Sequence, residues 1–272
     1  MNYETVGNLT LPKIGFGTWK VGGNMSPNRS LDAQSLAALR YALELGYTHI
    51  DTAEMYGGGH CEELVGQAVR GSGKNRDELF ITSKVMPSHL SYNDTLKACE
   101  NSLRRLQMDY IDLYLIHWPQ MGMKLEDTFR ALNKLVREGQ VRHLGVSNFN
   151  LKLLKQSQEL CETRILTNQV PYSVSERSYV SNGVLEYCQQ NSILLTAYEP
   201  VDKGHLRSSR ALESVAKAHN ATIFQIALAW LIAQACVITI PMSFNPQHIK
   251  ENFEAADLAL TQDELKTLNE AY

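Results

Sequence analysis

Short apolar runs alternate with helix-like segments along nearly the whole chain, and this alternation restricts the fold more than any other feature. Several runs are apolar throughout, which is typical of strands that are buried on both faces. Eight strands are predicted: Ile14–Gly17, Thr48–Asp51, Leu79–Ser83, Ile111–His117, Val141–Ser147, Leu166–Val170, Leu194–Tyr198 and Val237–Ile240. Strands of this kind with helices between them indicate a parallel sheet.

The intervening segments have the spacing of amphipathic helices. Ser30–Leu45 stops at Gly46, a residue type common just after a helix. Similar apolar stripes predict helices over residues 61–69, 94–106 and 125–136, and a terminal amphipathic segment after Thr261.

Residues 222–241 are apolar and about long enough to cross a bilayer. Gln225 and Gln234 interrupt them, and the β-branched run Val237–Ile240 stops at Pro241. A buried helix followed by a buried strand is therefore expected instead of a membrane span.

An α/β fold with eight strands over about 240 residues matches the size of a (β/α)8 TIM barrel, which we expect to form one domain over residues 1–272. An open doubly wound sheet is the alternative, but it would carry a glycine-rich fingerprint after its first strand. Gly15-Phe-Gly17 lacks the third glycine, and no helix opens after Trp19. Tyr3–Val6 and Leu9–Lys13 flank Gly7-Asn8 and predict a small N-terminal hairpin that covers one barrel mouth.

Charge and cysteine content exclude several classes of protein. The formal net charge is -3, so neither nucleic acid nor an anionic membrane is expected as a partner. The five cysteines are dispersed without a CxxC pair, which argues against a disulfide framework and a structural zinc site. The N-terminus shows no signal-peptide pattern, and a cytoplasmic protein, monomeric or weakly homo-oligomeric, is the expectation.

Four chemically active side chains occur at or just after the ends of three successive strands. Asp51 and Tyr56 follow the second predicted strand, Lys84 follows the third and His117 closes the fourth. The carboxyl ends of barrel strands meet at one face, where barrel active sites lie. Each residue alone would more often be structural, but their joint placement favours one shared catalytic site.

The four residue types suit proton transfer to a carbonyl oxygen. A phenol has a pKa of about 10, and a nearby ammonium would lower it. We therefore expect Tyr56 to act as general acid, with Lys84 tuning it and Asp51 holding Lys84 charged. His117 would orient the same substrate oxygen. The set is a poor group of ligands, so no metal is expected.

The chain resembles the aldo-keto reductases, and the resemblance covers essentially all of it. The motifs that carry it, in the family's order, are Gly15-Phe-Gly17-Thr-Trp19; Gly46-Tyr-Thr-His-Ile-Asp51-Thr-Ala-Glu-Met-Tyr56-Gly; Phe80-Ile-Thr-Ser-Lys84-Val; Asp109-Tyr-Ile-Asp112-Leu-Tyr-Leu-Ile-His117-Trp-Pro; Val141-Arg-His-Leu-Gly145-Val-Ser147-Asn148-Phe; Asn168-Gln169-Val; Thr196-Ala-Tyr198-Glu-Pro200; and Ile240-Pro-Met-Ser243 leading to Glu251-Asn252.

The resemblance implies a TIM barrel that reduces aldehydes or ketones with NADP(H), and it assigns Asp51, Tyr56, Lys84 and His117 to the catalytic tetrad. It places Ser147, Asn148 and Gln169 at the nicotinamide carboxamide and stacks Tyr198 on the ring. The other residues it implies for the cofactor are Gly17, Thr18, Trp19, Glu199, Pro200, Val201, Ile240, Pro241, Met242, Ser243, His248, Glu251 and Asn252, besides Asp51.

Two positions depart from the family pattern at the adenosine end. Met242 and His248 stand where the family usually has the lysine and arginine that contact the 2′-phosphate of NADP(H). Each charge-assisted hydrogen bond is worth about 1.5–3 kcal/mol, so phosphate recognition should weaken and NAD(H) becomes a candidate cofactor. Retained NADPH preference through Ser243 and His248 is the alternative. Glu199 would repel the pyrophosphate unless it turns away or pairs with Lys203.

The predicted substrate pocket is apolar and aromatic. Its walls are expected to be Trp19, Met55, Met86 and Trp118, together with Tyr56 and His117. Met55 and Met86 could equally pack the barrel mouth. The short tail after Thr261 offers no long loop to cover the pocket, so an open site and a broad range of small aldehydes are expected.

Two other functions remain open at this point. A non-catalytic regulatory subunit that responds to nicotinamide nucleotides could use the same barrel, although the intact tetrad argues against it. A sugar isomerase or lyase is a further alternative, since barrels host many chemistries. Neither the Ser147-Asn148 pair nor Tyr198 has an obvious use there.

Overall fold

The computed structural model of the protein describes residues 2–272 and contains one eight-stranded parallel sheet. Neighbouring strands follow the chain order without exception, as in a barrel built from repeated strand–helix units. The strands are β3 (Phe16–Gly17), β4 (His49–Asp51), β5 (Phe80–Val85), β6 (Ile111–Ile116), β7 (Val141–Ser147), β8 (Ile165–Pro171), β9 (Leu194–Tyr198) and β10 (Val237–Thr239).

The sheet closes between its first and last strands. Ile14 and Thr239 form a parallel bridge, and the Gly15 N–H donates to the Thr239 carbonyl at 2.8 Å. Gly17 is needed at this seam, because a Cβ there would lie 2.5 Å from the Ile240 carbonyl oxygen. The predicted (β/α)8 barrel is confirmed, and the open doubly wound sheet is excluded.

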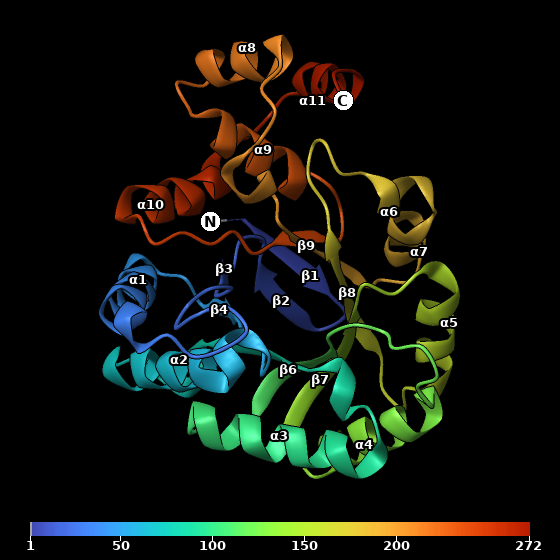
Figure 1. Ribbon diagram of the computed structural model, residues 1–272. Coiled ribbons are helices and arrows are strands. Elements are labelled where there is room, and N and C mark those ends of the chain that lie inside the picture. The colour runs from blue at the N-terminus through green and yellow to red at the C-terminus, as the bar shows by residue number, and fades with distance from the viewer. Residues whose placement is uncertain (1) are drawn as a thin grey trace.

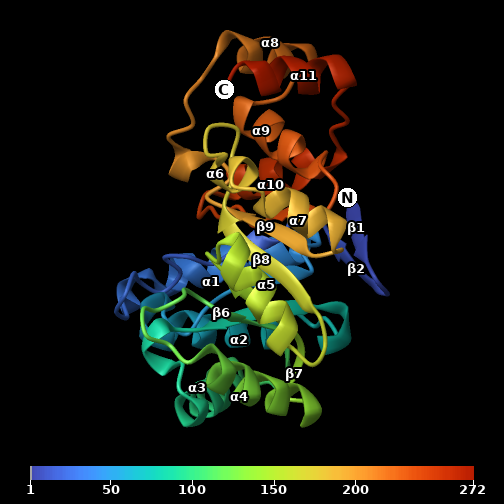
Figure 2. The same ribbon diagram turned by 90° about the vertical axis from the view of Figure 1, so that its right-hand side faces the viewer.

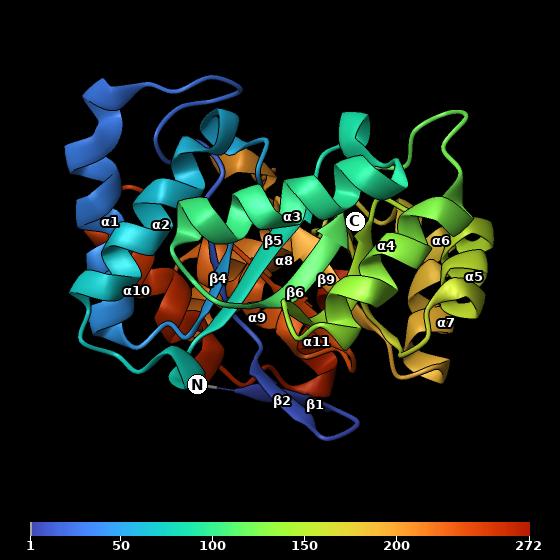
Figure 3. The same cartoon turned by 90° about the horizontal axis from the view of Figure 1, so that it is seen from below.

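Helices return the chain outside the barrel from one strand to the next (Figure 1). Figure 3 shows α2, α3 and α4 side by side over the strands from β4 to β6. The helices are α1 (Asp32–Leu45), α2 (His60–Gly71), α3 (Tyr92–Leu106), α4 (Leu125–Arg137), α5 (Leu151–Leu160), α6 (Ser178–Ser181), α7 (Val184–Gln190), α8 (Arg210–Ala218), α9 (Ile223–Ile232), α10 (Pro246–Glu254) and α11 (Gln262–Glu270).

Local sequence signals explain where several helices begin and end. α1 ends at Gly46, which has a left-handed φ of 110° and donates to the carbonyls of Ala42 and Leu43, as predicted. α9 begins with a capping box between Thr222 and Gln225. The apolar stretch is thus a buried helix followed by β10. No helix within residues 2–272 is both long and apolar enough to cross a membrane.

An antiparallel hairpin of β1 (Tyr3–Val6) and β2 (Leu9–Pro12) precedes the barrel. Figure 2 shows it at one side of the molecule, away from α3 and α4. Its Val6 and Leu11 share a buried apolar cluster with barrel residues that include Phe80, the first residue of β5. The hairpin therefore closes the amino-terminal mouth and leaves the carboxyl-terminal mouth for the site.

Candidate active site

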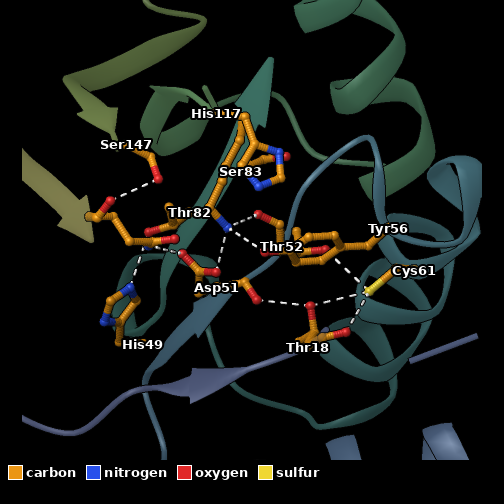
Figure 4. Close-up of polar contacts among 12 residues, drawn as sticks. Thr18, His49, Asp51, Thr52, Tyr56, Cys61, Thr82, Ser83, His117 and Ser147 are labelled. Carbon is orange, nitrogen blue, oxygen red and sulfur yellow. Dashed lines mark hydrogen bonds and ion pairs between the residues drawn. The ribbon is translucent and has the colours of Figure 1, made fainter. Parts of the chain in front are cut away.

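Three of the four predicted catalytic side chains contact one another at the carboxyl-terminal mouth. The Lys84 Nζ donates to Asp51 Oδ1 at 2.5 Å, to the Thr52 carbonyl at 2.9 Å and to the Tyr56 hydroxyl at 3.2 Å. Lys84 is 0% exposed and Asp51 is 1% exposed, so the ion pair lies away from water. The ammonium of Lys84 therefore joins the phenol to a fixed carboxylate, as the sequence predicts. Figure 4 shows Asp51, Tyr56 and His117 in this cluster.

Strand geometry brings these side chains together. Asp51 pairs with Thr82 in the parallel register of β4 and β5, and Lys84 lies two residues further along the same strand face. The intervening Ser83 points the other way and donates from its hydroxyl to Glu62 on α2. The strand continues through Lys84 to Val85, two residues beyond its predicted end.

Tyr56 lies in the 3-10 turn Tyr56–Gly59 that follows β4. Its ring makes edge-on contacts with Trp19, at 4.9 Å between ring centroids, and with His117, at 5.6 Å. These contacts hold the phenol from two sides, and they place His117, the fourth predicted residue, beside the other three.

Burial dominates the ionisation of the phenol. Burial raises the pKa of Tyr56 above its ordinary value, while the charge of Lys84 lowers it by a smaller amount. The expectation of a lowered phenol pKa is therefore wrong in its net direction. Burial destabilises the phenolate by more than the charge of Lys84 stabilises it. The phenol stays protonated at neutral pH, which is the form a general acid requires.

Lys84 and His117 respond to burial in different ways. Burial lowers the pKa of Lys84, but the charges and hydrogen bonds of Asp51 and Tyr56 outweigh it, so the pKa is raised. Burial, followed by the charge of Lys84, lowers the pKa of His117 to about 2. His117 is therefore a neutral imidazole that can donate one hydrogen bond. Its buried Nδ1 has no hydrogen-bond partner within residues 2–272.

The residues predicted for the nicotinamide form one hydrogen-bonded chain with the tetrad. The side-chain Nε2 of Gln169 donates to Asp51 Oδ2 at 2.8 Å, and the backbone carbonyl of Gln169 accepts from Ser147 Oγ at 2.8 Å. Asn148 Nδ2 donates to Ser147 Oγ at 2.9 Å, and Asn148 Oδ1 accepts from the Tyr198 hydroxyl at 2.8 Å. Amide and hydroxyl groups beside an aromatic ring suit a carboxamide on a flat heterocycle, so this donor set fits the nicotinamide.

The loop that follows Tyr198 is held by polar side chains. Glu199 pairs with Lys203 at 3.0 Å, so the carboxylate has the partner that its expected place beside a pyrophosphate requires. Asp202 accepts from Ser173 Oγ at 2.8 Å and also from the Ser175 hydroxyl. Pro200 and Val201 lie between these anchors.

The residues predicted for the adenosine end lie on the segment from β10 to α10. Gly17 N–H donates to the Pro241 carbonyl at 3.0 Å, which places this segment beside β3, Thr18 and Trp19. Ser243 Oγ accepts from the Asn245 N–H at 3.1 Å and keeps its own hydroxyl proton for another acceptor. On α10, His248 is exposed, Glu251 is half-buried and Asn252 is buried. Met242 precedes this helix and packs against the core.

The predicted substrate walls differ in exposure. Trp118 is 44% exposed, while Trp19, Met55 and Met86 are half-buried. Trp19 is fixed by its contact with Tyr56, so its indole borders the phenol directly.

One buried carboxylate beside the tetrad received no role from the sequence. Glu54 is 6% exposed and accepts from the Met86 N–H at 2.6 Å. The sequence does show a charged residue within the segment that joins Asp51 to Tyr56. A buried carboxylate there would need a partner, because glutamate is almost never fully buried unless it is paired.

A closed barrel with this polar cluster at the carboxyl ends of its strands defines the class of (β/α)8-barrel enzymes. The model of the Aldo/keto reductase family matches residues 13–272. Methylglyoxal reductase YeaE of Escherichia coli (strain K12) is 37% identical over 272 residues, which span 98% of this chain and 93% of the relative. The chain therefore belongs to the aldo/keto reductase family, and this confirms the resemblance.

Solved structures agree with this assignment. The crystal structure of the thermostable aldo-keto reductase Tm1743, in complex with the inhibitor epalrestat, has a TM-score of 0.97 at 43% identity and covers 100% of both chains. An aldo/keto reductase from Klebsiella pneumoniae, in complex with NADP and acetate, has a TM-score of 0.88 at 39% identity over 97% of this chain and 93% of that chain.

Acidification is expected to destabilise the protein through two buried histidines. Burial lowers the pKa of His49 to about 4, and that of His117 to about 2, from the ordinary value of 6.5. Below about pH 6.5 the unfolded chain binds these two protons, whereas the folded chain binds them only near pH 4 and pH 2. The free energy of unfolding is therefore unaffected by the two histidines above about pH 6.5 and falls as the pH drops below it. Each histidine should contribute a loss of about 2 kcal/mol by pH 5.

Urea unfolding at pH 7.5 and pH 5 would measure this loss. His49→Gln is the matched variant, since its amide can still bond the Thr82 hydroxyl that His49 Nε2 contacts at 3.0 Å. It should lose about 2 kcal/mol less than the parent protein on acidification, because all other titrating groups are shared. Equal losses in the two proteins would contradict the assignment.

Proposed function

We propose that this protein reduces small reactive aldehydes to alcohols with a reduced nicotinamide nucleotide, and that Tyr56 is the general acid. The observation that carries the proposal is the buried contact chain in which Asp51 holds Lys84 at 2.5 Å and Lys84 donates to the Tyr56 hydroxyl at 3.2 Å. The name of the relative YeaE, a methylglyoxal reductase, supports a small α-oxoaldehyde as the substrate class.

The side chains divide the chemistry between them. When bound, the reduced nicotinamide supplies a hydride to the carbonyl carbon. Tyr56 gives its hydroxyl proton to the carbonyl oxygen, which becomes the alcohol hydroxyl, and the ammonium of Lys84 stabilises the phenolate left behind. Neutral His117 donates a hydrogen bond that orients the same oxygen. Asp51 keeps Lys84 protonated throughout.

The first test is the oxidation of NADPH and of NADH by the purified protein with methylglyoxal. Turnover with either nucleotide would support the reductase. Nucleotide binding without turnover on a panel of small aldehydes would instead favour a regulatory subunit on the same barrel.

Cofactor preference is the finer part of the proposal. The Klebsiella relative is described with NADP, which supports a nicotinamide dinucleotide in general. In the segment expected at the adenosine end, Met242 packs against the core and His248 is exposed. The family resemblance implies a lysine and an arginine at these two positions. We propose relaxed specificity, with NADH accepted beside NADPH.

The double variant Met242→Lys with His248→Arg should bind NADPH about 10- to 100-fold more tightly. Two cations are restored toward the 2′-phosphate, and each charge-assisted bond is worth about 1.5–3 kcal/mol before the cost of ordering the side chains. NADH lacks this phosphate and is the internal control, with its Kd expected within about threefold of the parent value. Fluorescence titration measures both constants. A parent protein that already binds NADPH a hundredfold more tightly than NADH would contradict relaxed specificity.

A further inference from the structure

The chain between Asp51 and Tyr56 runs beside β5 as a short extension of the sheet. The Thr52 N–H donates to the Thr82 carbonyl at 2.8 Å, and the Glu54 N–H donates to the Lys84 carbonyl at 3.4 Å. The chain then leaves β5 to form the turn that carries Tyr56. Here the side chain of Glu54 replaces a backbone acceptor, because its Oε1 accepts the N–H of Met86, the residue that follows β5, at 2.6 Å.

The peptide unit between Val85 and Met86 is bonded on both sides. Its carbonyl accepts from the His117 N–H at 3.0 Å, and its N–H donates to Glu54. One rigid peptide plane therefore joins the segment that bears His117 to the segment that bears Tyr56. Lys84 directly precedes Val85 in the chain. The peptide unit is therefore connected to the segments that carry three members of the tetrad, Tyr56, Lys84 and His117.

Other contacts fix the Glu54 carboxylate in place. His89 Nδ1 lies 3.2 Å from Oε1 and 3.3 Å from Oε2, and Arg105 Nη2 lies 3.9 Å from Oε2. These groups satisfy a carboxylate that is only 6% exposed. The bond to the Met86 N–H is the one contact among these that reaches the backbone just after β5.

We infer that Glu54 is a positioning residue, which sets the separation of Tyr56 from His117 through the Val85–Met86 peptide. The inference rests on the proposed reductase function, because a substrate oxygen must reach both side chains. Misplacement of a reacting group by about 1 Å can cost about a hundredfold in rate. The decisive property of Glu54 is then the reach of its oxygen, since a neutral amide oxygen can accept the same N–H.

Two variants separate reach from charge. Glu54→Gln keeps the reach and loses the charge, so kcat should stay within about threefold of the parent value. Glu54→Asp keeps the charge and shortens the reach by one methylene, so kcat should fall at least about tenfold. The KM for methylglyoxal and the Kd for NADPH should stay within about threefold in both variants, since neither removes a group expected to touch them.

Hydrogen exchange of the Met86 amide provides a readout that does not depend on activity. Its protection should drop in Glu54→Asp and persist in Glu54→Gln. Glu62→Asp is the matched control, because this buried carboxylate accepts from the side chains of Ser83 and Arg105 and should leave Met86 exchange at the parent level. Both Glu54 variants are compared at equal folded fraction, measured by circular dichroism.

The order of the two variants decides the inference. If Glu54→Asp is active and Glu54→Gln is not, or if both lose activity, the charge matters and the inference is overturned. Equal kcat in both variants and the parent would also overturn it. Absence of turnover in the parent protein would contradict the proposed function alone, because Met86 exchange would still test the bond from Glu54.

Discussion

Tyr56→Phe is expected to lower kcat by about 10²- to 10⁴-fold, the range that a positioned general acid contributes. The substitution removes only the hydroxyl, which lies 3.2 Å from Lys84 Nζ. The ring should keep its edge-on contacts with Trp19 and His117, so the pocket wall survives. Nucleotide binding should therefore stay near the parent level while the proton donor is lost.

Stopped-flow measurement of a single turnover with NADPH and methylglyoxal would report the chemical step. Tyr47→Phe is the matched control, since it deletes another buried hydroxyl, which donates to the Ile249 carbonyl at 3.0 Å. That variant should keep kcat within about twofold, because the lost bond is remote from any proton transfer. A Tyr56→Phe enzyme with parent turnover would remove Tyr56 as the acid.

The direction of the phenol pKa shows where reasoning from sequence stops. The order of residues predicted that Lys84 would lie beside Tyr56, and a charge in water would lower the phenol pKa. The net shift depends on how completely water is excluded, and this follows from the packing of Trp19 and His117 around the ring. Burial of this kind is a tertiary property that no local motif contains.

The four residues predicted for the tetrad lie together for a physical reason. Parallel strands place their carboxyl ends at one mouth, so residues that end successive strands meet whatever their separation in sequence. Asp51 and Lys84 are 33 residues apart and yet form an ion pair at 2.5 Å. The bond from Glu54 was missed because a side chain replaces a backbone acceptor there, and period-2 patterns do not encode that replacement.

Some parts of the fold could not be predicted from the sequence for similar reasons. The first strand was predicted from Ile14, but β3 begins at Phe16, and Ile14 instead bridges to Thr239 across the closing seam. Closure is a contact between the two ends of the sheet, so no local pattern specifies it. Helix α6 spans only Ser178–Ser181, which is too short for an apolar stripe to develop.

Lys84→Met is expected to abolish turnover and to destabilise the fold by about 3–5 kcal/mol, because it leaves a buried carboxylate without its counter-charge. Asp51 would keep the bond from Gln169 Nε2 at 2.8 Å, but one neutral donor does not offset the loss of an ammonium at 2.5 Å. The size of the loss follows from burial, since exposed pairs contribute only about 0–1 kcal/mol.

The double variant Asp51→Asn with Lys84→Met tests this explanation against simple mispacking. An asparagine oxygen can still accept from Gln169, and neither charge of the pair remains, so most of the lost free energy of unfolding should return in urea denaturation. Turnover should not return, because nothing then stabilises the phenolate of Tyr56. A double variant no more stable than Lys84→Met would show that the cost arises from the shape of the methionine. Recovered turnover in that variant would show that proton donation by Tyr56 does not need the ammonium.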